Sequence, residues 1–88
     1  MAEKEKVTNK NIMEITVGGK KYTLQKVKPT TWLTILDDVQ ASEGKGNLVM
    51  YGKVLENIVV SPKMEIDDFE SFAELEEVVK TAIRFQRA

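Results

Sequence analysis

The sequence predicts an α+β domain in which an N-terminal β-hairpin is followed by three α-helices. Apolar and polar residues alternate on both sides of Gly18-Gly19, and apolar residues then recur at helical spacing in three later segments. Residues that start or stop helices separate those segments. A chain of 88 residues suffices for one domain, which we expect to cover residues 11–88.

The hairpin is expected at about residues 12–27. Gly18-Gly19 suits a two-residue type I′ turn, because that turn needs positive φ at both central positions. The turn sets a register that gathers the apolar side chains on one face, with Ile15 opposite Tyr22 and Met13 opposite Leu24. The first ten residues are charged and polar, so a disordered N-terminal tail is expected there.

Helices are expected at about residues 31–42, 48–60 and 68–87. Thr30 or Thr31 can cap the first helix, Asn47 the second, and Ser71 the third in a capping box with Glu74. The second helix has the widest apolar face, formed by Leu48, Tyr51, Val54, Leu55, Ile58 and Val59. We therefore expect it to be the most buried helix, at the centre of the monomer or at a contact between subunits.

No residue pattern in the sequence indicates catalysis. Histidine and cysteine are absent, which removes the commonest general base, thiol nucleophiles and most transition-metal sites. Asp37-Asp38 favours a solvated helix face, and Gly18-Gly-Lys-Lys21 lacks the spacing of a phosphate-binding loop. We predict that the protein is not an enzyme and has no catalytic residue, cofactor or metal site.

Composition also narrows the partners. The net charge is -1, which gives no reason to expect a nucleic acid, and there is no apolar run that could span a membrane. With no cysteine and no signal-peptide pattern, a cytoplasmic location is the expectation. Protein partners remain as the class that the sequence favours.

Two features favour protein binding. The edges of an isolated hairpin are open for pairing, and the second helix carries more apolar surface than one small core can cover. Gly52, inside that helix, either allows another backbone to approach or is simply tolerated. Trp32 is either a core residue or an interface anchor. The candidate protein-binding residues, for self-association or for an elongated apolar client, are Val49, Tyr51, Val60, Val78 and Phe85.

The order of features resembles one known family. A hairpin over residues 14–24 precedes an amphipathic helix, a Gly-rich loop, an apolar helix ending in Val59-Val-Ser-Pro62 and an acidic-capped last helix. This layout resembles the small tail-assembly chaperones of long-tailed bacteriophages and related prophage elements. The resemblance implies a non-structural protein in the cytoplasm of the host cell that shields the tape-measure protein and helps to recruit tail-tube subunits.

The resemblance also implies that a longer product can arise by frameshifting, in which case this chain, ending at Ala88, would be the shorter one. The alternative is a generic small cytosolic adaptor or regulatory domain that binds proteins.

Overall fold

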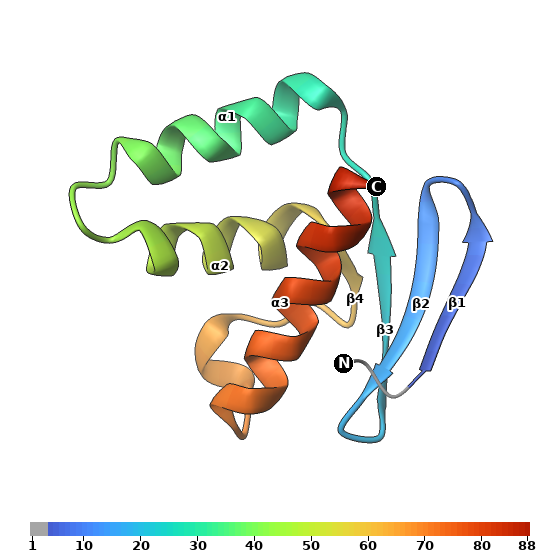
Figure 1. Ribbon diagram of the computed structural model, residues 1–88. Helices are drawn as coiled ribbons and strands as arrows, with labels where there is room; N and C mark the ends of the chain where they lie inside the picture. The colour runs from blue at the N-terminus through green and yellow to red at the C-terminus, as the bar shows by residue number, and fades with distance from the viewer. Residues whose placement is uncertain (1–3) are drawn as a thin grey trace.

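The computed structural model describes residues 4–88, which form a four-stranded antiparallel sheet and three α-helices, so the predicted α+β class is confirmed (Figure 1). The sheet order is β1-β2-β3-β4. The elements follow one another as β1 (Lys4–Asn9), β2 (Ile12–Val17), β3 (Lys20–Gln25), α1 (Pro29–Gln40), α2 (Gly46–Asn57), β4 (Val59–Ser61), the short 3₁₀ helix η1 (Ile66–Asp68) and α3 (Phe72–Arg87).

The predicted hairpin is present as β2 and β3. Its register is the expected one, because Ile15 lies opposite Tyr22 and Met13 opposite Leu24. Gly18 and Gly19 have φ values of 59° and 79°, as the turn requires. The apolar face of the hairpin is buried. The Gly-Gly turn and the alternation of apolar and polar residues therefore predicted both the hairpin and its register correctly.

The N-terminal segment differs from the expectation. A disordered tail was expected for the first ten residues, but Lys4–Asn9 forms β1 and pairs with β2; residues 1–3 lie outside the described part of the chain. β1 is an edge strand whose residues from Glu5 onward are exposed, so it has no apolar alternation to identify it. Glu5 accepts a hydrogen bond of 2.6 Å from Arg84 on α3, which ties this strand to the last helix.

The second helix is shorter than predicted. It ends at Asn57, and the segment Val59–Ser61 forms β4 against β3 instead of a last helical turn. β-branched side chains at Ile58, Val59 and Val60 favour this extended pairing. Since β1 and β4 flank the hairpin on both sides, the expectation that its edges are open is wrong.

The helix starts differ in detail. The first two helices begin after Lys28 and Lys45, so Thr30, Thr31 and Asn47 are not their caps. Pro29 takes the first position of α1, where its missing N–H costs nothing. Ser71 does cap α3, since its Oγ accepts a hydrogen bond of 3.2 Å from the Glu74 N–H.

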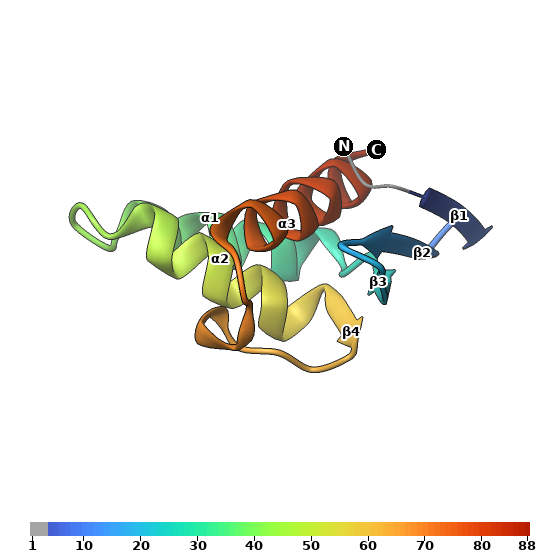
Figure 2. The same cartoon turned by 90° about the horizontal axis from the view of Figure 1, so that it is seen from below.

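The core lies between the sheet and the last helix. α3 crosses the face of the sheet, while α1 and α2 form an antiparallel pair that extends away from it (Figures 1 and 2). The buried side chains are Met13, Ile15, Val17, Tyr22 and Leu24 of the sheet, Val54, Leu55, Ile58 and Val59 around the end of α2, and Leu75, Val78, Val79, Ala82 and Phe85 of α3.

The most buried helix is α3, and not α2 as expected. Six residues of α3 are buried, against two of α2, Val54 and Leu55. α2 contacts the rest of the domain mainly through its C-terminal half, because its N-terminal half projects with α1 beyond the sheet (Figure 1). The apolar residues near the start of α2 are therefore left partly or fully exposed.

Candidate protein-binding groove

An open groove of about 780 Å³ lies between α2 and the segment that leads from β4 into η1. One wall is α2 from Leu48 to Glu56, and the other is the chain from Lys63 to Asp67. The residues that line it are Leu48, Val49, Gly52, Lys53, Leu55, Glu56, Lys63, Met64, Glu65, Ile66 and Asp67. Its volume lies within the range of about 300–1,000 Å³ typical of ligand sites.

The α2 wall of the groove is apolar, and at Gly52 it has no side chain. Leu48 is 61% exposed, Val49 is half-buried, and Gly52 follows one turn after Leu48. No heavy atom outside the glycine and its immediate backbone surroundings lies within 4 Å of the position that a Cβ at Gly52 would occupy. The helix backbone is thus accessible at this point of the groove, so a partner backbone could approach closely at Gly52.

The opposite wall combines apolar side chains with carboxylates. Met64 and Ile66 are half-buried against the core, and Asp67 is exposed. Two hydrogen bonds hold this wall in shape, because the Asp68 N–H donates to the Glu65 carbonyl oxygen at 3.0 Å while the Asp68 carboxylate accepts from the Glu65 N–H at 2.8 Å.

The two lysines of the groove are engaged within the protein. The ammonium group of Lys53 lies 4.0 Å from carboxylate oxygens of both Asp38 and Glu56. That of Lys63 donates to the carbonyl oxygens of Glu56 and Val59, at 2.8 and 3.1 Å, at the C-terminal end of α2.

An aromatic pair stands beside the groove. Tyr51 follows one turn after Leu48, and its ring stacks on that of Phe72 at the start of α3, with centroids 6.4 Å apart and an interplanar angle of 9°. Phe72 is 66% exposed. Tyr51 and Phe72 thus add apolar surface next to the groove wall at Leu48.

The structure separates the five predicted binding residues. Val49 lines the groove and Tyr51 lies beside it, while Val60 is exposed on β4 outside the groove lining. Val78 and Phe85 are core residues, 0% and 7% exposed, so their assignment to a surface edge of the last helix is wrong. They face the sheet because α3 lies across it, an arrangement that helical periodicity alone does not reveal.

Sequence reasoning missed several apolar residues in or beside the groove. Leu48 and Phe72 were not among the predicted binding residues, nor were the groove residues Met64 and Ile66. Phe72 lies three residues before Leu75 and seven before Val79, so helical periodicity groups it with the buried stripe of α3 and gives no sign that it is exposed. Trp32 is half-buried and packs against the core, which favours the core alternative for this residue.

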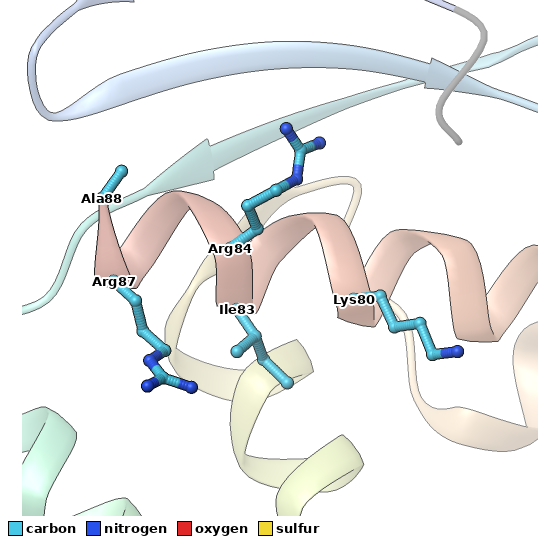
Figure 3. Close-up of a pocket in the computed structure, with 5 residues that line it drawn as sticks. All are labelled: Lys80, Ile83, Arg84, Arg87 and Ala88. Atoms are coloured by element: carbon cyan, nitrogen blue, oxygen red, sulfur yellow. The ribbon is translucent and has the colours of Figure 1, made fainter.

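A second hollow lies at the end of α3, lined by Lys80, Ile83, Arg84, Arg87 and Ala88 (Figure 3). Figure 3 shows Arg84 and Ile83 on opposite sides of the helix, so the cations do not converge on one point. Arg84 is paired with Glu5, and Lys80 lies 3.5 Å from Glu76. Arg84 and Arg87 lie in the last turn of α3, where cations complement the negative end of the helix dipole; these contacts account for the cations without a ligand.

A buried tyrosine with a raised pKa serves the fold. Tyr22 is fully buried, its ring stacks on Phe69 at 6.1 Å, and its hydroxyl donates to the Glu74 carboxylate at 3.4 Å. Burial and the neighbouring Glu74 charge raise the pKa of Tyr22 to about 12. This contact joins the hairpin to the first turn of α3 and lies outside the groove.

Within residues 4–88, no group of three acidic, histidine or cysteine side chains is placed to hold a metal ion. In the same range, none of the helices combines the length and the apolar character needed to cross a bilayer. Comparison with known proteins finds no matching family model, no matching curated protein and no matching solved structure.

Proposed function

We propose that this chain is a non-catalytic protein-binding domain whose α2–η1 groove receives an apolar segment of a partner protein. The observation that carries the proposal is the accessible apolar surface along an open groove, with Leu48 61% exposed on the groove wall and the Tyr51–Phe72 pair beside it. Apolar patches that a small domain leaves uncovered mark sites of protein interaction.

The resemblance to phage tail-assembly chaperones indicates the class of partner. We propose that the domain acts as a tail-assembly chaperone, which shields an elongated apolar client such as a tape-measure protein and helps to recruit tail-tube subunits. The layout of hairpin, helix pair and acidic-capped last helix supports this. The groove supplies a place where such a client could be held. A generic adaptor that binds one folded partner is the alternative.

The two functions differ in what the domain does to its client. The test is co-expression of the full chain with a fragment of a tape-measure protein from the same genome. The chaperone proposal expects the fragment to move from the insoluble to the soluble fraction and to co-purify with this chain. A fragment that stays insoluble, with none retained, would contradict the chaperone proposal, and retention of a folded protein instead would favour the adaptor.

Self-association is tested on the same preparation. A second copy could cover Leu48 and Phe72 in the absence of a client. Sedimentation velocity over a concentration series then distinguishes the cases, because an open groove gives a monomer whereas a groove filled by a second copy gives a sedimentation coefficient that rises with concentration.

A further inference from the structure

Carboxylates outnumber lysines in the groove lining, which holds Glu56, Glu65 and Asp67 against Lys53 and Lys63. Glu65, Asp67, Asp68 and Glu70 lie within six residues that contain no lysine or arginine. Among residues 4–88, none of these four carboxylates takes part in an ion pair. The lysines of the groove are directed elsewhere, Lys53 to Asp38 and Glu56 and Lys63 to carbonyl oxygens. The part of the rim that follows Lys63 therefore presents carboxylates that have no salt-bridge partner among the described residues, beside the apolar groove lining.

The groove also restricts the backbone conformation of its occupant. Its lining residues belong to α2, to η1 and to the turn before η1, and none belongs to a strand. An extended segment buried there would leave its N–H and C=O groups without partners, which is costly. A helix satisfies those groups internally.

The dimensions suit a helix as well. The lining of α2 from Leu48 to Glu56 extends about 12 Å at 1.5 Å per residue. That length corresponds to about two turns of a helix packed against it. Gly52 lies at the middle of this length with open space above it, and small residues allow two helix backbones to approach closely.

From these observations we infer that the groove binds an amphipathic helix of a partner protein, with an apolar face over Leu48, Val49 and Gly52 and with basic residues along the flank that meets Glu65 and Asp67. This inference rests on the proposed function as a protein-binding domain and names the chemistry of its partner. Apolar anchors at i, i+3, i+4 and i+7 provide affinity in such a helix-in-groove contact, and the basic flank provides orientation and selectivity.

The test uses two labelled synthetic peptides of equal length. Both carry Leu at i, i+3, i+4 and i+7 over two repeats, and the flanking positions are Lys in one and Glu in the other. Fluorescence anisotropy with the full chain is expected to give at least about tenfold tighter binding of the Lys peptide, an effect that weakens with added salt. Equal affinities, or tighter binding of the Glu peptide, would overturn the charge assignment.

Two variants test the place of binding. Asp67→Lys is expected to weaken binding of the Lys peptide by about threefold or more, because it reverses a rim charge that has no partner to lose. Asp37→Lys is the matched control, with the same change of charge on exposed α1 outside the groove lining, and it should have a smaller effect. Equal effects of the two would show that the peptide responds only to net charge, and would overturn the assignment to the groove.

The helical conformation has its own test. A Lys peptide with proline at its centre cannot form an unbroken helix and is expected to lose most of its affinity. Retained affinity would show an extended occupant. A concentration-dependent dimer that the Lys peptide fails to dissociate would show that a second copy covers the groove. Either result would overturn the inference.

These outcomes can be distinguished from failure of the proposed function. If wild type and Asp67→Lys retain the tape-measure fragment equally well, the protein-binding function stands and the charge inference fails. If the Lys peptide binds as expected while no fragment is retained, the groove assignment stands and the chaperone proposal fails.

Discussion

Replacement of Gly52 by alanine should stabilise the folded domain while weakening its binding of a partner. Glycine in a helix interior costs about 0.8–1.0 kcal/mol relative to alanine. The added methyl group at Gly52 meets no atom within 4 Å, so no steric penalty offsets this gain. The unfolding entropy of an 88-residue domain is about 0.18 kcal/mol/K near 60 °C, and the expected rise in Tm is therefore about 4–6 °C.

The matched control is Gly18→Ala in the hairpin turn. Gly18 has a φ of 59°, and a Cβ there would overlap the Glu74 carboxylate. Strain at positive φ costs about 1 kcal/mol or more, and displacement of Glu74 removes the acceptor of the Tyr22 hydroxyl. The same substitution should therefore lower Tm at Gly18 and raise it at Gly52.

The assays are thermal unfolding followed by circular dichroism and urea unfolding with a shared m-value. Each variant is then titrated with the Lys-flanked peptide. A lower Tm for Gly52→Ala would refute the open space above Gly52. A higher Tm with unchanged peptide affinity would keep the fold intact and refute the close approach of a partner backbone at this residue.

Three further predictions concern the fold and the absence of chemistry. Ile15→Lys is expected to lower the free energy of unfolding by about 3 kcal/mol or more, because Ile15 is 1% exposed and the charge would have no partner. Thr16→Lys, on the other face of the hairpin, should lower it by about 1 kcal/mol or less in urea unfolding. Equal losses for the two variants would contradict the burial of the Ile15 face. The neutral Tyr22 is favoured in the fold because its pKa is raised from 10.0 to about 12, so the unfolded chain releases this proton first. Its contribution to stability, up to about 2–3 kcal/mol, is present below pH 10 and lost as pH rises to about 12; Tyr22→Phe should remove that part of the alkaline loss, and identical pH profiles would argue against the raised pKa. Calorimetry with Ca²⁺, Mg²⁺ and Zn²⁺ should detect no micromolar site on tag-free protein, and a saturable micromolar isotherm would contradict the non-catalytic, metal-free account.

The central part of the fold could be predicted because its signals are local. Gly18-Gly19 and the period-two alternation around it fix one turn and one register, since slipping by one residue would expose Ile15 and Tyr22. Ser71 likewise marks the start of α3, because its side chain supplies an acceptor that the first turn lacks.

The edges of the sheet could not be predicted in the same way. β1 lies at an edge and is exposed from Glu5 to Asn9, so it carries no apolar alternation, and its pairing with β2 depends on backbone hydrogen bonds. β4 is only three residues long, and Val59 and Val60 also fit the helical pattern of the preceding segment. Both strands are recognised only once a partner strand is present.

The groove, like the edge strands, could not be predicted in full, because it is formed by segments that only the tertiary structure brings together. Val49 and Tyr51 were predicted from the excess of apolar residues on the second helix, and they do lie in or beside the groove. Val78 and Phe85 were assigned to a surface because periodicity does not tell which of two apolar faces meets the sheet. The η1 wall has no periodic signal at all, since Met64 and Ile66 sit in a turn and a short 3₁₀ helix.

We propose that the exposed apolar wall of the groove holds a client. The most direct measurement compares Leu48→Gln with Leu33→Gln for retention of the tape-measure fragment in co-expression. Leu48 and Leu33 are 61% and 58% exposed, so both variants should fold, but only Leu48 lines the groove.

Burial of a leucine exposed to this degree is worth about 1–2 kcal/mol. We therefore expect Leu48→Gln to weaken retention by about fivefold to thirtyfold, with Leu33→Gln close to wild type. Equal retention by both variants and wild type would contradict the claim that the groove is the binding site.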